Sequence, residues 1–243
     1  MKTLLNEIFK VFIRITVAIL FCLILFAINF LIGGYLRSQT NPFLSNIWTV
    51  SSANFAASML IFVLLMLALS RGKISTYGLK ITSNIQLKRT TILGLSVGIV
   101  FTLIGLLFPF GENPATANFS FIQIVIFVWI YASISEEVLT RGLIQSYLEP
   151  LTRYGFTVFE LRISLPVLTS AIIFALLHMG LLSTGMGINS VLYIVLFAFI
   201  VGLIAAFYRE KTGSLIPAII VHIFANIGGT CTAYGLEIIK QIS

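Results

Sequence analysis

Seven long apolar segments constrain the fold of this chain more than any other feature. As helices, they are expected to cross about 30 Å of hydrocarbon. In chain order they are Ile15–Leu31, Phe55–Leu69, Ile92–Phe110, Phe119–Leu148, Pro166–Leu182, Ile188–Tyr208 and Leu215–Tyr234. Only 9% of the residues are charged and 58% are hydrophobic, which excludes an ordinary soluble globular protein. We therefore expect an all-α polytopic membrane protein that forms one integral-membrane domain over residues 1–243.

The positive charges indicate how the chain lies in the membrane. The net charge is +7, but the Lys and Arg residues lie in short loops, whereas a nucleic-acid site needs them on one face. If the N-terminus is cytoplasmic, only Arg37 and Lys240 of the fifteen cations lie outside, and Arg141 lies within the fourth span. The positive-inside rule therefore predicts a cytoplasmic N-terminus and an extracytoplasmic C-terminus. In the basic loop 70–90, Tyr77, Leu79 and Ile81 are expected to contact headgroups.

The acidic residues and short motifs exclude several kinds of hydrolase. All eight acidic residues are Glu, so no Asp can orient a histidine, and the zinc motif HExxH is absent. The run "GLSVG" (94–98) matches the GxSxG motif of serine hydrolases, which needs a turn between a strand and a helix. Here the run opens an apolar segment, so Gly94 and Gly98 are better explained as small residues that let two helices approach closely.

Polar side chains within three of the predicted spans are the candidate functional residues. The fourth span ends in "SISEEVLTRG" (133–142), and the two histidines, His178 and His222, lie in the fifth and seventh. At 1.5 Å per residue, Glu136 lies about 16 Å deep, His178 about 21 Å, His222 about 12 Å and Asn226 about 18 Å. The four groups therefore reach similar membrane depths. Ionisable groups at such depths are costly and are generally functional.

Helical spacing assigns these groups to faces. Glu137 and Arg141 are four residues apart and are expected to pair, whereas Glu136 is rotated by about 100° and stays free to act as a base. His222 and Asn226 are also four residues apart, so both can donate hydrogen bonds to one developing oxyanion. An alternative is a buried ionic cluster that only fixes helix register, although such clusters rarely stabilise a protein.

Three motifs then resemble those of the CPBP family of intramembrane proteases, also called Abi. They are "EEVLTRG" for EExxxR, "FALLH" (174–178) for FxxxH, and "HIFAN" (222–226) for HxxxN. The family includes the CaaX prenyl endopeptidases of the Rce type and bacterial proteins linked to bacteriocins. The similarity covers residues 133–227. Thr140 departs from the family, which commonly has an aromatic residue there, and we expect this to affect the pocket lining rather than the polar groups.

The resemblance implies hydrolysis of a peptide bond within the membrane. By this comparison Glu136 and His178 activate water, and His222 and Asn226 stabilise the oxyanion. Glu137, Arg141 and Phe174 would support the site or contact the substrate. Glu136, His178 and His222 also make a plausible zinc set. We favour a site without metal, because Rce-type members resemble metal-free enzymes and few carboxylates remain to anchor the histidines.

The expected substrate is a hydrophobic or lipid-associated peptide, reached from the cytoplasm or inner leaflet. In a bacterial cell membrane, the location that we favour, it would be a bacteriocin or pheromone precursor, or the chain would confer self-immunity. In a eukaryote it would be a prenylated CaaX peptide. Two other functions stay open: a catalytically idle scaffold or immunity factor, and a small proton-coupled transporter.

Overall fold

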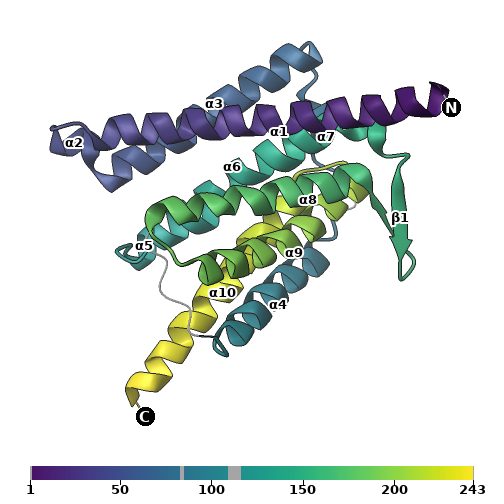
Figure 1. The fold of residues 1–243 in the computed structure, drawn as a ribbon. Helices are drawn as coiled ribbons and strands as arrows, with labels where there is room; N and C mark the ends of the chain where they lie inside the picture. Colours follow the sequence, from purple (N-terminus) through teal and green to yellow (C-terminus); the bar gives the residue numbers. More distant parts are fainter. Residues whose placement is uncertain (1, 83–84, 109–115, 243) are drawn as a thin grey trace.

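The computed structural model describes residues 2–82, 85–108 and 116–242, and these are almost entirely helical (Figure 1). By length and composition, seven of the helical stretches can cross a membrane. Five of them consist wholly or mainly of one α-helix: α1 (Lys2–Arg37), α3 (Ile47–Ser70), α4 (Leu87–Gly105), α9 (Ile188–Thr212) and α10 (Ile216–Ile242). The expectation of an all-α polytopic membrane protein is confirmed.

The other two spans are composite. The fourth contains α5 (Phe121–Gln123), η2 (Ile124–Ala132), α6 (Ser133–Glu137), η3 (Val138–Ile144) and α7 (Gln145–Tyr147). The fifth contains α8 (Leu165–Leu177) followed by η5 (His178–Thr184). The remaining short elements are α2 (Pro42–Ser45), η1 (Ile74–Tyr77), η4 (Glu149–Leu151), β1 (Gly155–Val158) and β2 (Leu161–Ser164).

Several helices are longer than the apolar segments that predicted them. The first segment was expected over Ile15–Leu31, but α1 runs over Lys2–Arg37. Hydropathy marks only the part of a helix that lies in hydrocarbon, and a helix continues until a cap or a breaker ends it. Such caps are present at other ends: Asn46 accepts from the Trp48 amide (2.8 Å) before α3, and Gly213 at φ 69° ends α9. The predicted end of the third segment, Phe110, lies outside the described residues.

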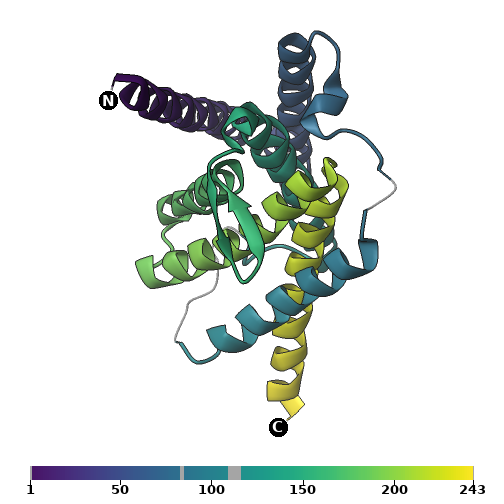
Figure 2. The ribbon, with the colours of Figure 1, turned by 90° about the vertical axis from the view of Figure 1, so that its right-hand side faces the viewer.

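The fourth span lies in the middle of the bundle. It contacts α1 and α3 on one side and α8, α9 and α10 on the other. Figures 1 and 2 show α1 and α3 side by side, with the remaining spans grouped beyond the fourth. The main apolar core joins α1, α3, the fourth span and α8, and includes Cys22, Phe62, Met66, Leu143 and Leu148. This position buries Glu137 and every residue of η3, including Arg141, which is what these charged residues require.

Gly94 and Gly98 allow α4 and α10 to pack closely, as the sequence predicted. A Cβ atom at Gly94 would lie 2.5 Å from the Val221 carbonyl oxygen, and one at Gly98 would collide with the Ala225 carbonyl. Both glycines are buried, whereas Ser96 between them is exposed. The GxSxG run is therefore a helix contact within α4 and not a turn between a strand and a helix.

Two details differ from expectation in the loop that follows α3. Tyr77 and Leu79 pack against the main core, and only Ile81 stays exposed, at 85%. The loop is held to the start of α10 because the Leu215 amide donates to the Gly78 carbonyl (2.9 Å) and Ser214 Oγ donates to the Lys80 carbonyl (2.6 Å). These hydrogen bonds hold the loop on the bundle, so Tyr77 and Leu79 are covered by protein.

A two-stranded antiparallel hairpin of β1 and β2 was not predicted from the sequence. It lies between the fourth and fifth spans, at the end of the bundle that holds the N-terminus, while the C-terminus lies at the other end (Figure 1). The two cysteines, Cys22 and Cys231, are both free.

Candidate active site

The fourth span changes its winding on both sides of the two glutamates. η2 and η3 are wound as π-helix, and α6, which carries Glu136 and Glu137, lies between them. Such wide turns are rare and occur frequently at functional sites. Ser133, at the start of α6, donates its hydroxyl to the carbonyl of Val128, five residues earlier (3.3 Å). The carboxylates are therefore presented from a short α-helical stretch flanked by two looser ones.

Glu137 is the centre of a buried charged network. Its Oε1 atom accepts from Arg141 Nη1 (2.9 Å) and from His222 Nδ1 (2.9 Å). The side chains of Glu137 and Arg141 are 0% exposed, so the ion pair expected from their spacing is present and completely shielded. A carboxylate that accepts from Nδ1 fixes the orientation of an imidazole and leaves Nε2 as its second functional nitrogen.

Glu136 lies on the other side of the same imidazole. Its Oε2 atom is 3.8 Å from His222 Nε2, and its side chain is 35% exposed. This separation is too long for a direct hydrogen bond, but a water molecule beside the pair can contact both atoms. His222 therefore lies between an accessible carboxylate and a buried one, and the charge of Glu137 is offset by Arg141.

Arg141 is enclosed by three neighbours besides Glu137. Its guanidinium carbon lies 4.4 Å from the centre of the Phe174 ring, a cation–π contact, and Nη1 donates to Thr140 Oγ1 (2.6 Å). A Cβ atom at Gly202 of α9 would lie 2.8 Å from Arg141 Nη2 and 2.9 Å from Phe174 Cδ1. A glycine at this position in α9 therefore makes room for the guanidinium and the ring.

Thr140 belongs to the polar network, contrary to the expectation that its departure from the family concerns only the pocket lining. Its Oγ1 accepts from Arg141 and donates to the Glu136 carbonyl (2.6 Å). The Thr140 hydroxyl thus links the Arg141 guanidinium to the backbone carbonyl of Glu136. An aromatic side chain cannot make this link, so in this chain the threonine adds a polar contact to the motif.

We expect Thr140→Val to lower the free energy of unfolding by about 1–3 kcal/mol, because the fully buried Arg141 would lose an acceptor. Thr140→Ser, which keeps the hydroxyl, should have a much smaller effect. Denaturant unfolding in mixed micelles measures both. Thr232→Val is the matched control, because the Thr232 hydroxyl bonds to the carbonyl of Gly228 in its own helix. Equal losses at positions 140 and 232 would contradict a role in the charged network.

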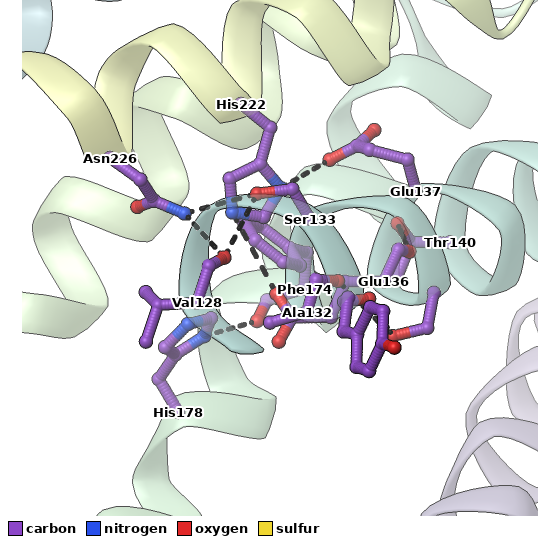
Figure 3. A network of polar contacts seen from close by, with 12 residues as sticks. Val128, Ala132, Ser133, Glu136, Glu137, Thr140, Phe174, His178, His222 and Asn226 are labelled. Carbon is purple, nitrogen blue, oxygen red and sulfur yellow. Dashed lines mark hydrogen bonds and ion pairs between the residues drawn. The ribbon is translucent and has the colours of Figure 1, made fainter. Parts of the chain in front are cut away.

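His178 and His222 lie on either side of Phe174. The Phe174 ring centre is 5.0 Å from that of His178 and 5.3 Å from that of His222, both edge-to-face. His178 Nδ1 lies 3.0 Å from the Phe174 carbonyl oxygen, so as the donor it leaves Nε2 as the free nitrogen. The contact forms where α8 passes into η5, which turns the imidazole toward the fourth span (Figure 3).

Asn226 contacts the fourth span and not His222. Its Nδ2 atom donates to Ser133 Oγ (3.1 Å) and to the Val128 carbonyl (3.4 Å). It also borders a cavity of about 220 Å³ between α4, α9 and α10. Both donors of the carboxamide are therefore engaged with the backbone and side chain of a neighbouring helix.

The structure thus places Glu136 and Glu137 beside the two ring nitrogens of His222, pairs Glu137 with Arg141, and places His178 beyond Phe174. The zinc alternative does not fit this arrangement. Within the described residues, no three His, Cys, Asp or Glu side chains lie close enough together to hold a metal ion, and this applies to Glu136, His178 and His222 as well.

Two contributing residues, Ser133 and Gly202, were not singled out from the sequence, and Thr140 was expected to affect only the pocket lining. Ser133 and Thr140 lie within or next to the charged motif. A hydroxyl in an apolar helix commonly hydrogen-bonds to a nearby polar group, and this is the signal that could have revealed their contacts. Gly202 lies in an apolar helix, where a small residue indicates close approach by a neighbour, but its neighbours were not predictable.

Residues 118–228 match the family model described as type II CAAX prenyl endopeptidase Rce1-like. The resemblance to the CPBP family is confirmed. The Rce1-like segment contains all three motifs and covers the fourth to sixth spans and the first half of α10. Rce1-like proteins are a protease family, which supports a peptide hydrolase at the level of the family. No curated protein and no solved structure gives a significant match to the chain.

Proposed function

We propose that this chain is an intramembrane endopeptidase that hydrolyses a peptide bond in a hydrophobic or lipid-associated substrate. The observation that carries the proposal is the placement of His222 between an accessible Glu136 and a buried, charge-paired Glu137 within the Rce1-like segment. A purely structural cluster would not require a third of a glutamate side chain to stay exposed. The exposed carboxylate supports access by water.

In the proposed reaction Glu136 is the general base. It takes a proton from water while the water oxygen bonds to the carbonyl carbon of the scissile peptide. The tetrahedral intermediate then collapses, the carbon–nitrogen bond breaks, and the proton passes to the leaving nitrogen. Glu136 returns to its ionised form, and the products are a carboxylate and an amine. Glu137 and Arg141 hold the His222 ring throughout and touch no reacting atom.

The two histidines act from opposite sides of Phe174 in this proposal. His178 orients the attacking water through Nε2, together with Glu136. His222 offers Nε2 to the developing oxyanion when that nitrogen is protonated. Asn226 would have to release Ser133 and Val128 to join it, so in the described arrangement we assign Asn226 to positioning α10 against the fourth span.

The location of the site within the membrane spans favours one class of substrate. A site within seven apolar spans admits an apolar peptide more readily than a charged one. In a bacterial membrane we propose a bacteriocin or pheromone precursor, or a role in self-immunity, and in a eukaryote a prenylated CaaX peptide. The site would open toward the cytoplasm or inner leaflet.

The test is to compare membrane-associated peptides in cells that carry the native chain and cells that carry His178→Ala. A cleavage product that forms only with the native chain identifies the substrate and supports hydrolysis. Identical peptide profiles at equal protein abundance would contradict the proposal and favour an idle scaffold. Proton-coupled uptake by the chain in liposomes would favour the transporter instead.

We also propose that the N-terminus is cytoplasmic. The basic loops and the N-terminus lie at one end of the bundle, where Arg14 donates to the Tyr147 carbonyl (3.3 Å) and Arg209 to Ser146 (3.1 Å). A reporter fused after Ser243 is expected to give an extracytoplasmic signal, because seven spans place the two ends on opposite sides. A cytoplasmic signal would contradict the orientation or the number of spans.

A further inference from the structure

The hairpin between the fourth and fifth spans has one apolar face and one polar face. β1 and β2 pair in the register Phe156 with Ile163 and Val158 with Leu161, and these four side chains share a face. The intervening pair is Thr157 with Arg162, which lies on the other face. Phe156, Val158 and Leu161 are between 42% and 52% exposed, so the apolar face is largely uncovered by the rest of the chain.

The tip of the hairpin is apolar and conformationally costly. Phe159 and Glu160 form the turn with φ of 45° and 66°, in the left-handed region that favours glycine or asparagine. A bulky residue is uncommon there, and the Phe159 side chain is 94% exposed. Strained positions of this kind are kept where the side chain has a role. An aromatic side chain extended from a strained turn indicates a contact with something outside the described chain.

The base of the hairpin lies at the level of the charged turns of α1. Arg153 pairs with Glu7, and the Tyr154 hydroxyl donates to Glu7 (3.3 Å). Lys10 pairs with Glu7 as well (3.0 Å), so this part of α1 is at the height where charged groups meet lipid headgroups. Figures 1 and 2 show the hairpin crossing the end of the bundle, in contrast to the helices that run through it.

We propose that the apolar face of the hairpin, with Phe159 at its tip, inserts into the lipid monolayer on the N-terminal side of the bundle. Lipid is the occupant because the hairpin continues directly into the membrane-spanning α8 and its base lies at headgroup height. Aromatic side chains concentrate at that depth. Arg162, which is exposed on the polar face, supplies positive charge beside anionic headgroups, whereas the charge of Arg153 is offset by Glu7.

The anchor would fix the height of the fifth span. Ser164 ends β2, caps α8 by accepting from the Val167 amide (3.3 Å), and donates to Glu210 of α9 (2.5 Å). The hairpin is thus joined to two spans, and α8 carries His178 at its far end. Insertion of the hairpin would therefore hold both helices at a constant depth. This inference depends on the membrane fold and not on the proposed reaction.

Neighbouring residues on opposite faces provide a matched test. Val158→Cys, Phe159→Cys and Thr157→Cys would each be made with Cys231→Ser, since Cys22 is buried, and labelled with a nitroxide in phosphatidylcholine–phosphatidylglycerol vesicles. Collision with oxygen reports lipid, and collision with a soluble nickel chelate reports water. We expect at least a threefold higher ratio of oxygen to nickel accessibility at positions 158 and 159 than at position 157.

Two results would overturn the proposal. Equal nickel accessibility on both faces would place the hairpin in water. Protection of positions 158 and 159 from both reagents would indicate a protein partner or a second copy of the chain. Phe159→Glu provides a second measurement that does not use a label: a charged tip is expected to raise protease cleavage within residues 155–164 in intact vesicles, whereas Glu160→Gln should not. Unchanged cleavage with Phe159→Glu would also contradict insertion.

Discussion

Glu136→Gln is expected to lower the rate of peptide-bond hydrolysis by about 10²–10⁴-fold, the usual contribution of a general base. The carboxamide has nearly the same shape as the carboxylate but cannot accept a proton at neutral pH. Because the Glu136 side chain is partly exposed and its approach to His222, at 3.8 Å, is too long for a hydrogen bond, the free energy of unfolding should change little. Single-turnover assays with the identified peptide, in vesicles or detergent, measure the rate.

The control for this variant is Glu237→Gln, which makes the same chemical change at an exposed position on α10. It should leave both rate and stability unchanged. If Glu136→Gln retains the native rate at normal abundance, Glu136 is not the base. If Glu136→Gln abolishes cleavage but retains the cellular phenotype at normal abundance, the scaffold alternative is favoured.

Arg141→Met is expected to lower the free energy of unfolding by about 3–5 kcal/mol, the largest effect on stability that we predict. The loss arises because Glu137 would keep a buried charge with no cation beside it. Both side chains are 0% exposed, so water cannot replace the guanidinium. Methionine has a similar length and can still contact Phe174, so little of the loss should come from packing.

The double variant Glu137→Gln with Arg141→Met separates the effect of the buried charges on stability from their effect on activity. Without either charge, most of the lost stability should return, because a neutral pair carries no buried ion. Activity should not return, since glutamine is a weaker acceptor for His222 Nδ1 and holds the ring less firmly. Reversible unfolding in mixed micelles and the cleavage assay measure the two effects. Recovery of activity with stability would show that the pair acts only on folding.

The spans and the charged pair were predictable because they depend on local sequence. A run of apolar residues long enough to cross hydrocarbon has few alternatives to a helix. Glu137 and Arg141 pair because a helix places residues four apart on one face, and Gly94 and Gly98 face α10 for the same reason. These features follow from the backbone repeat and require no knowledge of the neighbours.

The hairpin shows why other features were missed. Its sequence does alternate, because polar or small residues separate the apolar Phe156 from Val158 and Leu161 from Ile163. This is the pattern of half-buried strands. However, the turn is Phe159–Glu160, without the glycine or asparagine that indicates a two-residue hairpin. The turn signal was absent because the sequence places an exposed aromatic residue where the backbone would favour glycine.

The site contacts between spans were beyond sequence reasoning. Similar depths for Glu136, His178 and His222 follow from residue counts, but which atoms meet depends on helix rotation. The wide winding of η2 and η3 alters that rotation on both sides of α6 and leaves no mark in hydropathy. Asn226 of α10 thus reaches its partner Ser133 in the fourth span only after the helices have packed.

Phe174 touches the guanidinium of Arg141 and the rings of both histidines. One aromatic ring therefore contacts three side chains that come from three different membrane spans. A substitution at position 174 would displace the guanidinium and both imidazoles together. A change in the placement of one of these groups alone would have to come from a residue that contacts only that group.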